Sequence, residues 1–339
     1  MKTTDFAEHL ATFLTMYLPG QKGSSKNTIA SYSDTFKLIL MFAEDKCNIP
    51  IERLTLNKFN GEFIETFLIW LEEERHNSIA TRNQRLTAIR SFTKYVRKKK
   101  PEFLFEGQKI LEIDSKETPK TEVSHLSSDC VQEILAQPKS SDKYGRRDIV
   151  MLSLMYDSGA RVSEICDLEV GAVRIQKPYT IRLLGKNNKS RSVPIMESTA
   201  IVLEKYLVEN RLLSPEKQNY PLFSNHQRSK LARAGIAYIL KKYCDAARKN
   251  NPMIPAPISP HVLRHSKAFH MLQAGINLVY IRDFLGHSCI ETTEIYARAD
   301  TEMKRVAIEN ANIRIEPDLP DWAQDKSLMA LLMSISGRD

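Results

Sequence analysis

The sequence predicts a mainly α-helical protein of two domains, with a small antiparallel β-sheet only in the second. Its 339 residues exceed the usual size of one hydrophobic core, so about two domains are expected. Apolar residues recur with a period near 3.6 through the first part of the chain, and strand-like segments first occur near residue 180. We therefore expect a helical bundle over residues 1–106, a linker over 107–123, a mixed domain over 124–318 and an amphipathic tail over 319–339.

Composition and charge restrict the class of protein. A content of 42% hydrophobic and 27% charged residues is typical of globular domains, and a net charge of +8 suggests a polyanionic partner. No apolar run reaches the roughly 20 residues needed to cross a bilayer. Acidic residues near the N-terminus disfavour a signal peptide, so we expect a cytoplasmic protein with no membrane partner. The cysteines form no C-x-x-C pair and predict reduced thiols rather than disulfides or a zinc site: Cys47, Cys130, Cys166, Cys244 and Cys289.

Three helices are predicted in the first domain from their apolar stripes. One follows the turn-forming segment 20–25 and carries the stripe from Ile29 to Leu40. A second spans Phe63 to Leu71, and a third runs from about Ile79 to Val96 before Pro101 ends it.

The third helix has an unusual polar face. From Ser78 to Lys100 there are eight Lys or Arg residues and no Asp or Glu, so no i,i+4 ion pairs can form. Cations mixed with small hydrogen-bonding side chains suit a helix that contacts DNA phosphates and groove edges. An ordinary basic surface helix remains the alternative. The candidate DNA-binding residues are Asn83, Thr87, Arg90, Ser91, Lys94 and Lys98.

The elements of the second domain are predicted from helix-capping residues, from residues that end helices, and from short strand-like segments beside a turn. Ser127 and its neighbours form a helix N-cap cluster, and Ser158-Gly159 ends a strongly apolar helix over Ile149–Tyr156. Two short strands, Thr180–Leu184 and Arg191–Ile195, flank a turn-rich hairpin connection. Ser259-Pro260 then begins a helix at His261, because proline is favoured at the first helical position.

Six polar residues stand near these breaks and have chemistry suited to a phosphodiester. Paired guanidinium groups bind phosphate oxygens, a lysine can protonate a leaving oxygen, and histidines transfer protons near neutral pH. A tyrosine hydroxyl can attack phosphorus and form a covalent intermediate. Each residue alone also has an ordinary structural explanation, for example a surface ion pair or core packing. The six candidates are Arg161, Lys186, His261, Arg264, His287 and Tyr296.

The order of these residues carries a family resemblance. The matching stretches are S-G-A-R-V-S-E-I from Ser158, G-K from Gly185, R-S-V-P-I from Arg191, H-V-L-R-H from His261 and L-G-H-S from Leu285, followed by Tyr296. Together they resemble the tyrosine recombinases, the family of phage integrases, transposon integrases and Xer-type resolvases. The first domain is similar in size and helical pattern to the core-binding domain of that family. A mainly α protein with a helical core-binding bundle and an α+β catalytic domain is therefore expected.

The resemblance implies a role for each candidate residue. Arg161 and Arg264 match the phosphate-binding arginines, and Tyr296 matches the nucleophile. Lys186 matches the hairpin general acid because it follows Gly185, although Lys189 shares the hairpin. The remaining matches are His261 and His287 as the two histidines and Glu164 or Asp167 as a residue orienting an arginine, while His265 receives no chemical role. A pair such as His261 and His265 lacks the H-E-x-x-H pattern of a zinc site, so no metal is expected.

The resemblance also implies a reaction and an assembly. It implies site-specific recombination of double-stranded DNA at a core site through a 3′-phosphotyrosyl bond, without metal, ATP or other cofactor. Four protomers on two DNA sites are implied. The tail from Trp322 to Ile335 is expected to dock on a neighbouring protomer, with packing on its own domain as the alternative. A type IB-like topoisomerase and a non-catalytic DNA-binding protein are the alternatives. Integration, excision, resolution and inversion remain equally open, and so does the DNA target.

Overall fold

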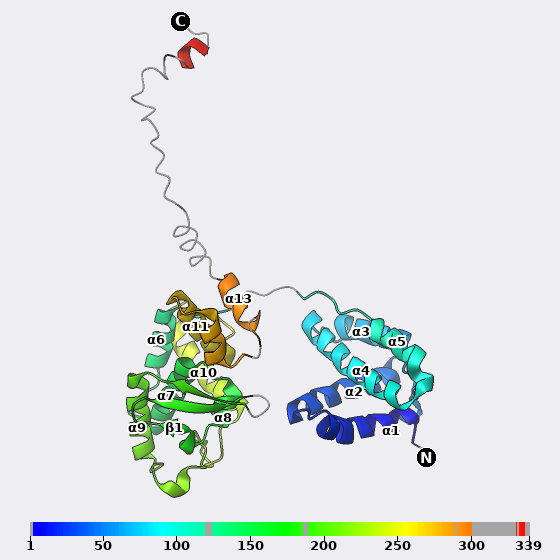
Figure 1. Cartoon of the computed structure of the whole chain (residues 1–339), viewed down its shortest axis with the longest axis horizontal. Coiled ribbons are helices and arrows are strands. Elements are labelled where there is room, and N and C mark those ends of the chain that lie inside the picture. The colour runs from blue at the N-terminus through cyan, green and yellow to red at the C-terminus, as the bar shows by residue number, and fades with distance from the viewer. Residues whose placement is uncertain are drawn as a thin grey trace. The chain divides into compact units, whose positions relative to one another are not determined.

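The computed structural model describes residues 3–118, 124–185, 189–287, 289, 291–299, 330 and 332–335. The chain divides into two compact units, Met1–Thr121 and Glu122–Asp339, which are considered separately below (Figure 1). None of the helices in the described part of the chain has the length and apolar character that spanning a bilayer requires.

The first unit is a bundle of helices, as the periodicity predicts. Ser25 and Ser78 directly precede two of the predicted helices, and each side chain accepts a hydrogen bond from a backbone N–H in the first turn. The ring of Phe92 packs edge-on against four other aromatic rings at 5.0 to 5.7 Å and holds the bundle together. The elements are α1 Asp5–Thr12, η1 Phe13–Gln21, α2 Lys26–Asp45, η2 Ile51–Arg53, α3 Gly61–Glu73, α4 Ile79–Lys99, η3 Pro101–Phe103 and α5 Leu104–Glu112.

Helix α5 occupies the start of the segment that the sequence assigned to the linker. Its apolar residue Ile110 and the following Ile113 are buried in the core of the first unit. The chain beyond it is also held, because Arg82 donates to the carbonyl of Asp114 and the Lys116 ammonium contacts Glu72 at 2.9 Å. The helical bundle therefore extends past residue 106, and the expectation of a linker beginning at residue 107 is wrong at that end.

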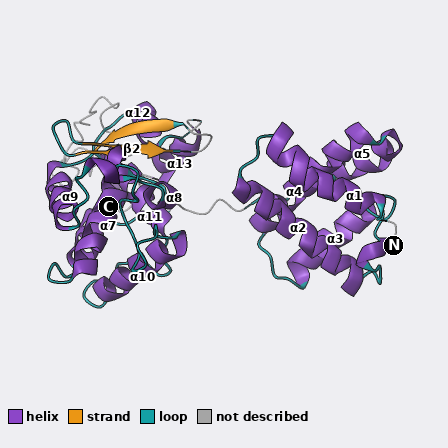
Figure 2. Cartoon of the chain, turned by 90° about the horizontal axis from the view of Figure 1, so that it is seen from below, coloured by secondary structure: helices purple, strands orange, loops and turns teal. Residues whose placement is uncertain are grey.

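The second unit contains helices and one small sheet. Its three antiparallel strands have the order β1-β2-β3 and lie along one side of the helices (Figure 2). The register pairs Ile181 with Val193, and both side chains are buried, so the predicted hairpin of two short strands is confirmed. The elements are α6 Ser128–Ala136, α7 Lys143–Ser158, α8 Val162–Cys166, η4 Val170–Ala172, β1 Val173–Arg174, β2 Thr180–Leu184, β3 Ser190–Pro194, α9 Glu197–Glu209, η6 Pro215–Lys217, α10 Arg233–Arg248, α11 Pro260–Gln273, α12 Leu278–Leu285 and α13 Glu291–Ala299.

Two glycines bring the ends of α7 and α12 together. Gly159 ends α7 and Gly286 ends α12, both in the left-handed region at φ 56° and 65°. A Cβ atom on Gly159 would lie 2.7 Å from the side chain of Leu285, the last residue of α12. Because only glycine fits this approach without strain, the two helix ends meet at one place.

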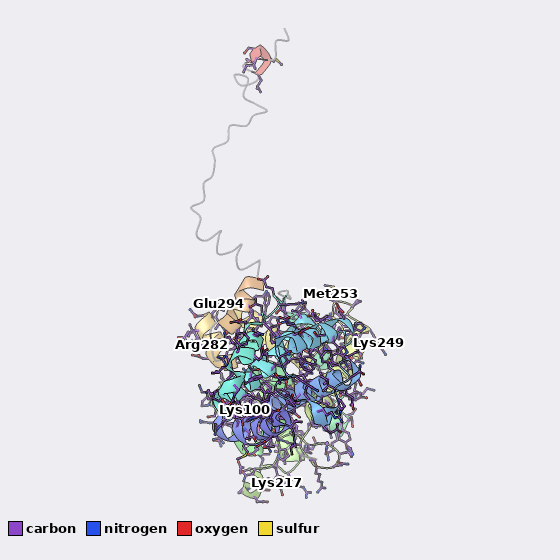
Figure 3. All side chains as sticks on the ribbon, turned by 90° about the vertical axis from the view of Figure 1, so that its right-hand side faces the viewer. Lys100, Lys217, Lys249, Met253, Arg282 and Glu294 are labelled. Carbon is purple, nitrogen blue, oxygen red and sulfur yellow. The ribbon has the colours of Figure 1, made fainter. Side chains whose placement is uncertain are left out.

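Helices α11, α12 and α13 pack around a small apolar cluster that includes Leu285 and Tyr296. Figure 3 labels Arg282 on α12 and Glu294 on α13, two helices in mutual contact. This cluster fixes α13 on the body of the unit. Of the predicted tail, Leu332, Met333 and Ile335 are exposed, whereas Trp322 lies outside the described residues.

Candidate active site

Arg161 and Arg264 lie at the junction of the α7 and α12 ends. Arg264, on α11, is 4% exposed, and its guanidinium donates to the carbonyls of Gly159 at 2.6 Å and Leu285 at 2.7 Å. Arg161 precedes α8, is partly exposed, and donates to the carbonyl of Gly286 at 3.1 Å. Burial, followed by the charge of Arg161, lowers the pKa of Arg264 to about 9. Arg264 therefore remains cationic at pH 7 despite its burial and the nearby charge of Arg161.

Glu164 is the carboxylate that organises this part of the site. Its side chain is 2% exposed and accepts hydrogen bonds from the backbone and guanidinium of Arg161 at 2.7 and 3.0 Å. Arg191, on β3, binds the same carboxylate in a bidentate manner at 2.8 and 2.9 Å. Burial opposes the charge, but the hydrogen bonds and charges of Arg191 and then Arg161 outweigh it and lower the pKa of Glu164. Asp167, the other orienting candidate, instead pairs with Lys230 at the surface.

Three arginines bind three successive carbonyls at the end of α12. Arg191 donates to Phe284 at 2.9 Å, while the carbonyls of Leu285 and Gly286 accept from Arg264 and Arg161. The sequence assigned Arg191 no role of its own, although it begins one of the matching stretches. This network ties the β2–β3 hairpin to the segment that carries His287.

The hairpin lysines are only partly described. Lys186 lies outside the described residues, as do residues 187 and 188. Lys189 is exposed, and its carbonyl accepts a hydrogen bond from the backbone N–H of Gly185 at 2.8 Å. The choice between Lys186 and Lys189 therefore stays a prediction.

Tyr296 lies on α13 with its side chain buried, at 1% exposure. Its hydroxyl is 2.9 Å from Nδ1 of His265, the residue after Arg264. Burial raises the pKa of the Tyr296 phenol, and the charges of Arg264 and Arg161 partly oppose that rise. The phenol is therefore within electrostatic reach of both arginines.

The histidines of the site are neutral at pH 7. Burial and the charges of Arg264, Arg161 and Arg191 lower the pKa of His287 to about 4, and its Nδ1 lies 2.9 Å from the hydroxyl of Thr293. Desolvation and the same Arg264 and Arg161 lower the pKa of His261. No group of three or more His, Cys, Asp or Glu side chains in the described residues is placed to hold a metal ion.

The candidate DNA-binding face of α4 is only partly free. Asn83 donates to the carbonyl of Lys116 at 2.7 Å, and Arg90 donates to the carbonyl of Ile113 and the hydroxyl of Ser115. Ser91 is buried and accepts a hydrogen bond from the Lys22 ammonium at 2.9 Å. The candidates with exposed side chains are Thr87, Lys94 and Lys98. DNA contact by any member of this set stays a prediction.

Comparison with known protein families identifies the class of both units. The model of the phage integrase family matches residues 124–303, and that of the phage integrase N-terminal SAM-like domain matches residues 12–100. The first match covers the unit that contains Arg161, Arg264 and Tyr296, and the second match covers the helical bundle. The chain belongs to the phage integrase family, the tyrosine-type site-specific DNA recombinases.

Individual relatives match along most of the chain. The y4rC protein of Sinorhizobium fredii is 35% identical over 336 residues, covering 98% of this chain and 99% of the relative. Tyrosine recombinase XerC of Herpetosiphon aurantiacus is 32% identical, covering 87% and 92%. Tyrosine recombinase XerD of Halalkalibacterium halodurans is 31% identical, covering 84% and 92%.

Solved structures share the fold. XerH recombinase, bound to a palindromic difH substrate in a post-cleavage complex, has a TM-score of 0.68 at 20% identity, covering 85% of this chain and 81% of that one. The Tn1549 transposon integrase, in complex with transposon right end DNA, has a TM-score of 0.67 at 13% identity, covering 89% and 99%. The predicted fold class, a helical bundle followed by a catalytic unit with a small sheet, is confirmed.

Proposed function

We propose that this recombinase cuts and rejoins duplex DNA through a covalent bond between the phenol oxygen of Tyr296 and a DNA 3′-phosphate. The observation that carries the proposal is the buried Tyr296, held on α13 within electrostatic reach of Arg161 and Arg264. The two guanidiniums would hold the non-bridging oxygens and stabilise the extra negative charge of the pentacoordinate transition state.

The bond changes balance without an external energy source. As the Tyr296 oxygen bonds to phosphorus, the bond from phosphorus to the 5′-oxygen breaks, and that oxygen takes a proton from the general acid. We assign the acid to Lys186 on the hairpin and keep Lys189 as its alternative. The 5′-hydroxyl of a partner strand then attacks the phosphotyrosyl bond and releases Tyr296. ATP is unnecessary because the covalent link conserves the bond energy.

Two histidines complete the proposed site. His261, at the start of α11, and His287, after α12, would hydrogen-bond the phosphate oxygens or transfer protons as neutral imidazoles. The lowered pKa of each imidazole favours hydrogen bonding to the phosphate through a neutral ring rather than through a permanent positive charge.

Duplex DNA is the proposed partner of both units. The catalytic unit would hold the scissile phosphate, and the exposed Thr87, Lys94 and Lys98 of α4 would contact the duplex near a major groove. The XerH and Tn1549 integrase structures named above are DNA complexes, which supports this partner.

Strand exchange between two duplexes would need four protomers on two sites. We propose that the tail contributes by docking on a neighbouring protomer, because the apolar Leu332, Met333 and Ile335 are exposed on their own chain. Truncation after Asp318 should then weaken tetramer assembly on DNA, measured by gel filtration of the protein–DNA complex. Unchanged assembly and activity would show that the tail does not dock in trans.

Trapping the covalent intermediate tests the reaction. Duplex fragments flanking the gene that encodes the chain, selected by footprinting, serve as substrate. The wild type should form a covalent complex that survives denaturant, and Tyr296→Phe should form none while it binds the fragment nearly as well. Covalent complexes in Tyr296→Phe would show that another residue is the nucleophile. Paired sites should also yield exchanged strands; relaxed topoisomers alone would support a topoisomerase instead.

A further inference from the structure

The hydroxyl of Tyr296 already has a partner that the family resemblance left without a role. Nδ1 of His265 lies 2.9 Å from that hydroxyl, and the phenol side chain is 1% exposed. The phenol cannot attack phosphorus with its proton in place, and bulk water has little access to a buried hydroxyl. We propose that His265 accepts the proton of Tyr296 during cleavage and returns it during rejoining. This inference rests on the proposed function, in which Tyr296 is the nucleophile.

The proton balance follows from the geometry. In cleavage, the phenol proton moves to His265 Nδ1 as the new O–P bond forms and the bond to the 5′-oxygen breaks. In rejoining, the partner 5′-hydroxyl attacks and passes its proton to the lysine that acted as general acid in cleavage. The tyrosyl O–P bond breaks, and His265 returns its proton to the phenol oxygen. Nδ1 must be unprotonated at the start, so the neutral ring carries its hydrogen on Nε2. The same residue thus serves both directions, as microscopic reversibility requires.

The other imidazoles are less well placed for this proton. His261 lies one turn earlier on α11, with its ring centroid 6.2 Å from that of His265. The Nδ1 of His287 already contacts the hydroxyl of Thr293 at 2.9 Å. Of these three imidazoles, His265 is therefore the one with a hydrogen-bond contact to the hydroxyl of Tyr296 among the described residues.

Charges around His265 explain how the base would be activated by DNA. The titratable groups that face it are His261 and Arg264 of its own helix, Tyr296 of α13, and His287 after α12. Burial, then His261 and Arg264, lower the pKa of His265 to about 4, so the ring is a weak base without DNA. A phosphodiester between the arginines adds negative charge beside the ring, which favours its protonated form. His265 would gain basicity only when its substrate is in place.

Replacing His265 with asparagine separates proton transfer from positioning. The carboxamide oxygen of Asn can accept a hydrogen bond near the position of Nδ1, but it cannot take up the proton. We expect His265→Asn and His265→Ala both to slow covalent complex formation by roughly 10²- to 10⁴-fold in single turnover, with near-normal DNA affinity. The rate that remains in His265→Asn should rise with pH, because a larger fraction of the Tyr296 phenol is already deprotonated at higher pH.

A second tyrosine–histidine pair, between Tyr156 of α7 and His270 of α11, supplies the matched control. His270 Nδ1 lies 2.7 Å from the hydroxyl of Tyr156, and both residues are half-buried. His270→Asn should change the cleavage rate by only a few-fold. A substrate with sulfur at the 5′-bridging position, whose thiolate leaves without protonation, should restore cleavage in Lys186→Ala but not in the His265 variants.

The outcomes separate this inference from the proposed function. Near-wild-type cleavage by His265→Asn would overturn the proton-acceptor role, and so would its rescue by the bridging sulfur. If His265→Ala is slow while His265→Asn is fast, His265 is only a positioning residue. A covalent complex that persists in Tyr296→Phe would instead refute the nucleophile assignment, whatever the His265 variants do.

Discussion

The buried Glu164 carboxylate is predicted to be a principal stabilising group of the catalytic unit. It accepts hydrogen bonds from the backbone and guanidinium of Arg161 and from both terminal nitrogens of Arg191, and its side chain is 2% exposed. Glu164→Gln keeps the shape of the side chain but removes its negative charge. The amide NH2 of the new side chain then faces a guanidinium, which is also a hydrogen-bond donor. Breaking one partner of a buried ion pair costs about 3–5 kcal/mol, because the remaining cations are left uncompensated.

That cost converts into a large thermal shift. For a domain of this size, 1 kcal/mol changes Tm by roughly 2–4 °C, so Glu164→Gln should lower the Tm of the catalytic unit by roughly 6–20 °C. Differential scanning calorimetry of the full chain measures it. The matched control is Glu209→Gln, because Glu209 also forms a bidentate pair, with Arg146 at 2.6 and 2.8 Å, but at the surface. Loss of this surface ion pair should change the Tm only slightly.

The same carboxylate predicts a pH dependence of stability. The pKa of Glu164 is lowered in the folded protein, so the unfolded state takes up a proton at higher pH than the folded state does. The contribution of Glu164 is therefore complete above its unfolded pKa and is lost as the pH falls through the lower, folded pKa. The Tm difference between wild type and Glu164→Gln should close in acid. Equal Tm losses for Glu164→Gln and Glu209→Gln at neutral pH would refute the reasoning.

Three further predictions concern catalysis, DNA binding and folding. Arg264→Lys cannot reproduce the two carbonyl contacts and should slow covalent complex formation on the order of 10²- to 10³-fold, measured in single turnover. DNA affinity should fall on the order of 10³-fold between about 50 and 200 mM salt. The slope of log affinity against log salt concentration should be smaller by roughly 2 in the double variant Lys94→Ala/Lys98→Ala and unchanged in Lys109→Ala. An affinity that does not change with salt would contradict DNA clamping. The pKa of His287 is lowered to about 4 in the folded protein, so the unfolded state takes up a proton at higher pH than the folded state does. Stability should therefore decrease as the pH falls from about 6.5 to about 4. In His287→Asn, the urea concentration at the unfolding midpoint should depend less on pH over that window.

Local sequence features were sufficient to predict several of the helices and the hairpin. Helices α2 and α4 have long apolar stripes with a serine N-cap directly before them, and β2 alternates buried and exposed residues. Helix α5 was missed because its nine residues carry a short stripe whose burial comes from packing on the rest of the bundle. A short amphipathic segment has no stable conformation of its own, so its structure depends on distant contacts.

The chemistry of the site was likewise divided between sequence and tertiary structure. The types and order of Arg161, Arg264 and Tyr296, together with the family resemblance that they carry, were sufficient to predict phosphoryl transfer to a tyrosine. Only the folded chain showed that Glu164 binds Arg191, 27 residues away, and that His265 contacts a phenol 31 residues away. Hydrogen bonds and buried charges act over a few ångströms, and residues that far apart in the chain come within that range only where helix ends and a strand converge. Residue types thus reveal which reaction is possible, whereas the partner of each polar atom is decided by packing.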